Sequence, residues 1–196
     1  MMILETRRIN LRPMDEDDNI LLHKWRNESN FIELFSNRRN PVSLEKFVLE
    51  MKRDFERNRH LQFMIELQIG DKKKSIGTIF AYDLNLTDGY IYISTYVVNE
   101  YWSKGYGVEA CILLTYHFFN TLPLHKIYFE LFSYNKPSLS SLVGMGLSEE
   151  GRFLGHRFFA GQRHDLLRYA IYRNSLERLK KLVDWFKREK KQIPQP

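Results

Sequence analysis

Residues 97–110 read Val97-Val98-Asn99-Glu100-Tyr101-Trp102-Ser103-Lys104-Gly105-Tyr106-Gly107-Val108-Glu109-Ala110. They lead from a run typical of a strand, through a turn with two glycines, directly into a run typical of a helix. The first amides of a helix have no partner within it and point outward, so they favour phosphate oxygens. Glycine at both turn positions lets a bulky diphosphate approach the backbone without meeting a Cβ atom. A tight connection without a ligand would explain the same two glycines, so the rest of the chain must decide.

The chain before this turn predicts one strand, two helices and an antiparallel meander. We expect the first strand within residues 4–13, which end at a proline. One helix should run through Trp25, and Ser43 should open the next. Two connections with hairpin chemistry then separate three strand-like runs, which are 61–69, 75–84 and 89–98.

The chain after the turn predicts further helices and strands in alternation. In order, we expect a helix, a strand, a short helix and two strands, at 105–120, 126–132, 137–144, 149–159 and 164–172. Asn174 and Glu177 form a plausible capping pair for a last helix. Its apolar positions recur every three or four residues, at Leu176, Leu179, Val183 and Phe186. The sequence therefore predicts an α/β domain at 1–173, followed by a basic amphipathic helix and tail at 174–196.

Length and charge limit the function classes that remain open. With 196 residues, of which 43% are hydrophobic, the chain can build one continuous core and is expected to form a single soluble domain. The formal net charge is +6, and residues 173–191 hold eight Lys or Arg against three acids, so this segment carries most of the excess. A basic tail on a nearly neutral body is more often a solvated helix face than a nucleic-acid site. The apolar stripe of the last helix would either pack on the body or contact a second subunit, so the sequence is compatible with a homodimer.

The single cysteine and the absence of long apolar runs bear on the compartment. Cys111 lies in an apolar run, which predicts a thiol buried in the core and excludes a disulfide within the chain. No charged-then-apolar leader opens the sequence, and no apolar run approaches the roughly 20 residues that span a bilayer. We therefore expect a cytoplasmic protein without a membrane partner.

Two separated strings of residues resemble one known family. The string from Tyr101 to Ala110 resembles the acetyl-CoA diphosphate-binding motif of the GCN5-related N-acetyltransferase (GNAT) superfamily, and the opening stretch 4–13 looks like the first strand of its ribosomal-protein N-terminal acetyltransferase subgroup. Further along, Asn135-Lys136-Pro137-Ser138 and the stretch 144–151 look like the second motif of that family. Two motifs in order over residues 4–172 are more specific than either alone.

The resemblance implies a fold and a set of site residues. The fold would be a mixed, mostly antiparallel, curved sheet flanked by helices, with acetyl-CoA between strands 89–98 and 126–132. The acetyl-CoA-binding residues would be Val97, Val98, Ser103, Lys104, Gly105, Tyr106, Gly107, Val108 and Asn135. Asn135 would also order the catalytic site, and Ser138 would protonate the departing thiolate. Purely structural roles would explain the same residues, since Asn135 suits a turn and Ser138 suits the first turn of a helix. No metal is implied.

The sequence also departs from the family pattern at positions that carry chemistry. Trp102 stands where many members have Arg or Gln, and Leu142 stands where many have a Tyr that acts as general acid. Residues 90–96 contain no acid, so the general base is unassigned among Glu150, Asp165, His156, His164 and water. Tyr90, Tyr92 and Tyr96 share one face of their strand and predict packing rather than an acceptor slot.

The function that the resemblance implies is acetyl transfer from acetyl-CoA to a primary amine. Direct transfer in a ternary complex is favoured, because the buried thiol of Cys111 is a poor covalent relay. The acceptor is either a small molecule, such as an amino sugar, or a protein N-terminus, and residues 20–45 and 160–163 should recognise it. The alternative is a non-catalytic acyl-CoA-binding sensor or scaffold.

Overall fold

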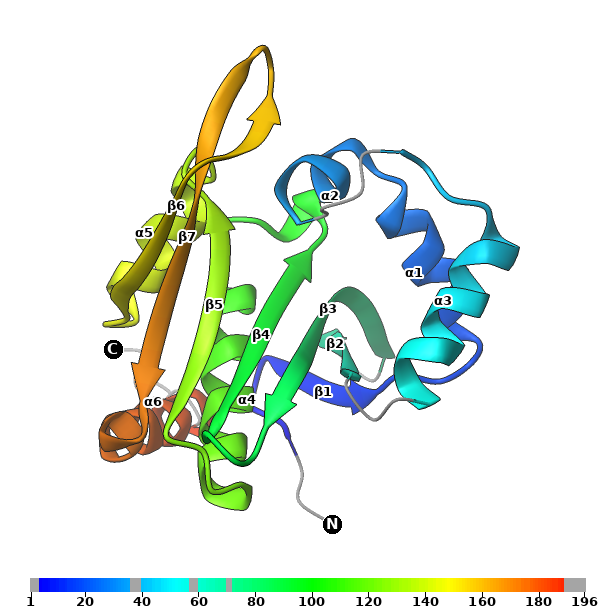
Figure 1. Ribbon diagram of the computed structural model, residues 1–196. Helices are drawn as coiled ribbons and strands as arrows, with labels where there is room; N and C mark the ends of the chain where they lie inside the picture. The colour runs from blue at the N-terminus through cyan, green and yellow to red at the C-terminus, as the bar shows by residue number, and fades with distance from the viewer. Residues whose placement is uncertain (1–3, 36–39, 57–59, 70–71, 189–196) are drawn as a thin grey trace, which may run out of the picture.

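The computed structural model describes residues 4–35, 40–56, 60–69 and 72–188 (Figure 1). Within them, seven strands form one sheet in the order β1-β2-β3-β4-β5-β7-β6. The strands are β1 (Ile9–Pro13), β2 (His60–Ile69), β3 (Lys72–Asn85), β4 (Tyr90–Val97), β5 (Lys126–Phe132), β6 (Ser148–Phe159) and β7 (Gln162–Tyr172). All neighbours pair antiparallel except β4 and β5, which are parallel. The predicted mixed, mostly antiparallel sheet is therefore confirmed.

The helices cover different parts of this sheet. They are α1 (Asp18–Arg26), α2 (Ser29–Leu34), α3 (Leu44–Glu56), α4 (Tyr106–Thr121), α5 (Lys136–Gly144) and α6 (Leu176–Lys187). Figure 1 shows α1 and α3 beside the half of the sheet that holds β1 to β3 and α2 near the upper end of β4, whereas α4 passes behind β4 and β5. The long β6–β7 hairpin extends from the other half of the sheet (Figure 1).

The alternation of β4 divides its side chains between two hydrophobic clusters. Ile91, Ile93 and Val97 belong to the main core, which α4 and α6 cover. Tyr96 points to the opposite face and is fully buried in a smaller cluster with Trp25. Burial of apolar area on both faces stabilises this central strand and fixes its register.

The two parallel strands separate shortly after they begin to pair. Their register covers three residues of each, Tyr90–Tyr92 beside Lys126–Tyr128, although both strands continue. The amide of Val98 donates to the carbonyl of Ile76 at 2.9 Å, which marks a hydrogen-bonded pair with β3. Because such pairs alternate along an antiparallel ladder, the N–H and C=O groups of Ile93, Thr95 and Val97 point away from β3. Beyond the residues that pair with β5, these groups face the gap that opens between β4 and β5, and there the carbonyl of Val97 accepts from Nε1 of Trp102 at 2.6 Å.

Most predicted elements are confirmed, and the first strand lies within residues 4–13 as expected. Before it, the Thr6 amide donates to the carbonyl of Ile9 in a turn. The sequence did not predict α2, which lies between the two expected helices. Asn174 does not cap the last helix, because a 3-10 turn at Arg173–Ser175 precedes it. Parts of the region expected to recognise the acceptor (36–39) and of the basic tail (189–196) lie outside the described residues.

Candidate acyl-transfer cleft

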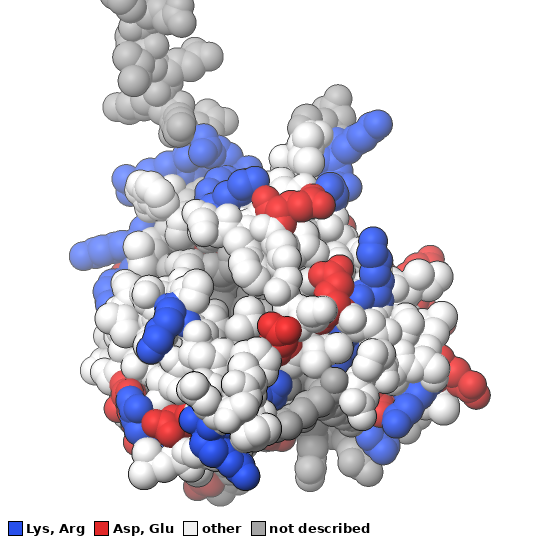
Figure 2. All heavy atoms as spheres, turned by 90° about the horizontal axis from the view of Figure 1, so that it is seen from above, with Lys and Arg blue, Asp and Glu red and all other residues white. Residues whose placement is uncertain are grey.

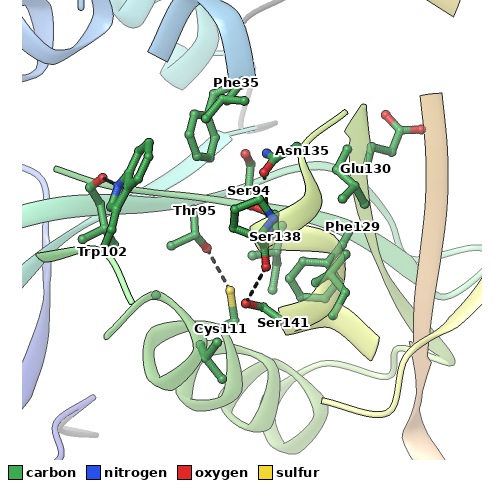
Figure 3. A pocket seen from close by; sticks show the side chains of 18 of the residues that line it. Phe35, Ser94, Thr95, Trp102, Cys111, Phe129, Glu130, Asn135, Ser138 and Ser141 are labelled. Atoms are coloured by element: carbon green, nitrogen blue, oxygen red, sulfur yellow. Dashed lines mark hydrogen bonds between the residues drawn. The ribbon is translucent and has the colours of Figure 1, made fainter. Parts of the chain in front are cut away.

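A cleft of about 640 Å³ occupies the gap between β4 and β5 and reaches the start of α4 (Figure 3). A cavity of this size is in the range of small-molecule sites. Eight residues expected at the site line it, namely Val97, Ser103, Gly105, Tyr106, Gly107, Val108, Asn135 and Ser138. The structure thus brings both sequence motifs together in one place.

The turn before α4 presents free amides to this cleft. Ser103 and Gly105 both have positive φ angles, 59° and 80°, so the chain doubles back tightly. The helix then begins at Tyr106, and its first helical hydrogen bond runs from the amide of Glu109 to the carbonyl of Gly105 at 3.0 Å. The amides of residues 106–108 consequently have no partner within the helix. A Cβ atom on Gly107 would lie 3.5 Å from Cγ2 of Val97, so glycine keeps this approach open.

Two residues expected at the site do not line the cleft. Lys104 directs its ammonium group away, where Nζ donates to the carbonyl of Glu100 at 2.9 Å and lies 5.1 Å from the ring centroid of Tyr101. Val98 uses its amide in the sheet with Ile76. Its side chain packs against the cluster of Trp25 and Tyr96 on the opposite face.

A buried ion pair, which the motifs did not reveal, stands directly behind the turn. The carboxylate of Glu109 is fully buried in the first turn of α4. Nε of Arg8 donates to its Oε2 at 2.7 Å, Nη2 of Arg8 contacts the same oxygen, and Oγ1 of Thr6 donates to Oε1. The opening string of the chain therefore meets the glycine turn in space.

Asn135 and Ser138 lie together at the start of α5. Asn135 is buried and caps this helix, with Oδ1 accepting from the amide of Ser138 at 3.3 Å. Ser138 is half-buried in the first turn. In Figure 3 these two residues lie between Phe129 and Phe35, above Ser141 and Cys111. The capping role of Asn135 is thus real, and it positions Ser138 at the cleft wall.

The thiol of Cys111 lies at the floor of the cleft. Its Sγ and Oγ1 of Thr95 are 2.9 Å apart (Figure 3). Burial raises the pKa of this thiol to about 11, because the interior disfavours the thiolate. At neutral pH the group is therefore a protonated, weakly nucleophilic thiol, as the sequence predicted.

Glu130 places a carboxylate at the far end of the cleft, on β5. Its Oε1 accepts from Nε of Arg168 at 2.9 Å and lies 2.7 Å from Nη2 of the same residue. Burial, and after it the charge of Glu130, raises the pKa of the neighbouring Tyr82 hydroxyl well above its ordinary value. Figure 3 shows the Glu130 side chain leaning toward β7, away from Cys111.

The four protein groups considered as bases from the sequence lie elsewhere. None of them lines the cleft. Glu150 pairs with Lys126 at 2.9 Å, and Asp165 pairs with Arg152 at 3.0 Å. Glu130 escaped notice because an isolated acid within an apolar strand carries no local signal of its partners.

Helix α2 closes one side of the cleft and is held from both ends. Glu28, just before it, accepts from the hydroxyl of Tyr96 at 2.7 Å. At its end, the carbonyl of Glu33 accepts from the hydroxyl of Tyr134 at 2.5 Å, and that of Ile32 accepts from Nη2 of Arg157 at 3.0 Å. These contacts connect α2 with the strands on the opposite side of the gap.

The surface around this end of the molecule carries little concentrated charge. Figure 2 shows Lys and Arg mainly around the edge of this face, with uncharged atoms filling most of its middle. Among the described residues, no helix is both long and apolar enough to cross a bilayer. The same part of the chain contains no group of three or more His, Cys, Asp or Glu that could hold a metal ion.

Comparisons with known proteins agree with this geometry. Residues 8–148 match the family model described as an acetyltransferase (GNAT) domain. No curated protein matches the sequence. Among solved structures, a spermidine N-acetyltransferase from Vibrio cholerae in complex with CoA and spermine is 20% identical, covers 87% of this chain and 98% of its own, and has a TM-score of 0.79.

A second structure is an α-N-protein acetyltransferase for ribosomal L7/L12, in complex with CoA. It is 16% identical, covers 87% of this chain and 98% of its own, and has a TM-score of 0.75. At these identities the two structures establish a shared fold, whereas the family model spans most of the sequence. The chain belongs to the GNAT family of acetyltransferases.

Proposed function

We propose that this acyltransferase moves an acetyl group from acetyl-CoA to a primary amine by direct transfer in a ternary complex. The observation that carries this proposal is one continuous cleft with three kinds of group along it. Free amides at the start of α4 lie at one end, the backbone of β4 beyond its ladder with β5 lies in the middle, and the Glu130 carboxylate lies at the other end. A donor with a diphosphate and an extended amide-containing arm fits the first two.

The donor would lie along the gap between β4 and β5. Its diphosphate would accept from the amides of residues 103–108, where the helix dipole also favours negative charge. Its pantetheine arm would pair with the backbone of Thr95 and with the amide of Val97, since the carbonyl of Val97 already accepts from Nε1 of Trp102 at 2.6 Å. An amide of this strand would donate to the oxyanion that forms at the thioester carbonyl.

The acceptor would approach from the side of Glu130 and α2. The carboxylate of Glu130 would take a proton from the incoming ammonium, directly or through water, and leave a neutral amine. The amine nitrogen then bonds to the thioester carbon, the C–S bond breaks, and Ser138 supplies a proton to the departing thiolate. The nitrogen loses its second proton, which returns through water to the oxygen of Ser138, and the proton held by Glu130 passes to solvent.

Two classes of acceptor have to be compared. The Vibrio cholerae structure is that of a spermidine N-acetyltransferase, and the second neighbour acts on a ribosomal protein. Hydrogen bonds with Tyr134 and Arg157 hold α2 beside the acceptor end, which supports a slender aliphatic amine over a bulky acceptor. A protein N-terminus would have to enter as an extended segment.

The first experiment is calorimetric titration with acetyl-CoA, followed by CoA-release assays with amino sugars, linear polyamines and N-terminal peptides. We expect binding, and release with one class of amine. Binding without release for any amine would contradict catalysis and identify an acyl-CoA-binding sensor. No binding would overturn the proposed donor site.

A further inference from the structure

The pair formed by Arg8 and Glu109 lies at the proposed diphosphate turn without contacting the reacting end of the cleft. The Glu109 side chain is completely buried, and the Arg8 side chain is 35% exposed. Two oppositely charged groups with this burial cost desolvation energy, which an apolar pair of similar volume would avoid. The pair therefore calls for an explanation other than stability alone.

Arg8 contacts each part of the turn. Nη1 donates to the carbonyl of Lys104 at 3.1 Å, between the two residues of positive φ. The guanidinium also lies 4.8 Å from the ring centroid of Tyr106. One side chain thus contacts both the carbonyl and the ring on either side of Gly105.

Glu109 and Thr6 in turn fix Arg8. Both oxygens of the carboxylate are engaged, one by Arg8 and the other by the hydroxyl of Thr6. Thr6 also accepts from the amide of Arg8 at 3.2 Å, so the residues before β1 are tied to the first turn of α4. A planar guanidinium bound in this way has little freedom to rotate.

The charges also matter for an anionic ligand. A carboxylate in the first turn of α4 would repel a diphosphate at the same helix end. The guanidinium of Arg8 stands between this carboxylate and solvent and compensates its charge, while the strained turn at Ser103 is held in place.

We propose that Arg8 and Glu109 are positioning residues for the diphosphate of acetyl-CoA, which act by holding the turn at residues 103–105 in its binding conformation. This inference rests on the proposed donor site. It assigns to the opening string of the chain a role in donor affinity and none in the chemical step.

The test compares two donors, acetyl-CoA and S-acetyl-pantetheine, which lacks the diphosphate and the nucleotide. For Arg8→Ala we expect the KM for acetyl-CoA to rise about tenfold, equivalent to about 1.4 kcal/mol, with kcat nearly unchanged. The kinetic constants for S-acetyl-pantetheine should stay at the wild-type values. Arg8→Lys, which keeps the charge but loses the fork, should recover only part of the affinity.

Arg12→Ala is the matched control, because Arg12 also pairs from β1, with Asp18 and Glu66, away from the turn. It should lower thermal stability and leave the KM for acetyl-CoA unchanged. If Arg8→Ala does not fold, the combined Arg8→Met and Glu109→Leu variant removes both charges and should fold with the same raised KM.

Three outcomes would overturn the inference. They are an unchanged KM for acetyl-CoA, an equal loss with both donors, or the same KM change in the Arg12 control. Failure of the proposed function looks different, because the wild type would then release no CoA with any amine. In that case calorimetric affinities for CoA and pantetheine still test the pair.

Discussion

At the scale of single residues, three of the groups that line the cleft bear directly on the proposed proton transfers and on the choice between direct and covalent transfer. Ser138 lies on its wall, Cys111 on its floor and Glu130 at its far end. Each has a different environment, namely a helix start, a buried hydroxyl–thiol contact and an ion pair with Arg168. Substitutions that preserve size can therefore separate their contributions.

Ser138→Ala should lower kcat about tenfold or more while the affinity for acetyl-CoA stays nearly constant, since general acid catalysis acts in the transition state. Steady-state kinetics with calorimetry would measure both. Ser141→Ala is the control, because its hydroxyl donates to the carbonyl of Pro137 at 3.0 Å within α5. An unchanged kcat would leave Ser138 as a first-turn residue alone.

Cys111→Ala should keep kcat within about threefold of the wild type, because its thiol, with a pKa of about 11, remains protonated at neutral pH. Because burial raises the pKa of this thiol, the thiolate forms only as the pH approaches about 11. Mass spectrometry after incubation with acetyl-CoA alone should show no acetylated protein. A covalent acetyl adduct on Cys111 that transfers to the amine would refute direct transfer.

Glu130→Gln should lower kcat/KM for the amine at neutral pH, by about tenfold or more, with little change in the KM for acetyl-CoA. The amide keeps the size of the side chain but cannot take a proton. Activity should recover as the pH rises toward the pKa of the free amine, since the neutral amine then comes from solution. Glu150→Gln, on the outer strand, is the control and should behave as wild type.

At the scale of elements, the turn before α4 depends on backbone freedom. Gly105 has φ 80° beside the cleft, and Gly161 has φ 79° at the tip of the β6–β7 hairpin, where a Cβ atom would meet nothing. Alanine at either position should cost about 1 kcal/mol of stability, because a side chain disfavours this conformation. Only Gly105→Ala should also weaken acetyl-CoA binding. Calorimetry and thermal unfolding of both variants would show this, and equal affinities would contradict the role of the turn.

Element types were predictable wherever a local pattern was strong. The glycine turn, the meander and the apolar face of α6 all follow from short-range periodicity. Helix α2 was not predictable, because it has six residues and none of them is buried. The turn before β1 was not predictable either, because Thr6 contacts Glu109, which lies 103 residues away in the sequence.

The same distinction holds for the site. Backbone groups of the turn and the cap at Asn135 belong to contiguous motifs, so sequence reasoning located them. The ion pairs Arg8–Glu109 and Glu130–Arg168 join residues that are far apart in the sequence and meet only in the folded chain. Lys104 shows that a place within a motif does not by itself put a side chain at the site, because its ammonium group points away from the cleft.

At the scale of the whole molecule, α4 connects the cleft to the C-terminal helix. Leu179 and Val183 of α6 are buried in the same core as α4. Arg173 donates from Nη1 to the carbonyl of Phe119 at 2.6 Å, near the end of α4. The apolar stripe expected either to pack on the body or to meet a second subunit therefore packs on the body, and the basic face of α6 is turned outward.

This arrangement predicts that the C-terminal helix stabilises the fold. Leu179→Ala should reduce the free energy of unfolding by about 3 kcal/mol, since Leu179 is 1% exposed and truncation leaves a cavity. Trp185→Ala, at 66% exposure, is the control and should change it by less than about 1 kcal/mol. Urea unfolding of both variants would measure the difference. Equal small effects of the two substitutions would mean that α6 is dispensable for stability. In that case, binding of an oligonucleotide to the wild type that weakens with salt would favour a nucleic-acid role for the basic face of α6. Salt weakens such binding because neutralised phosphates release counterions.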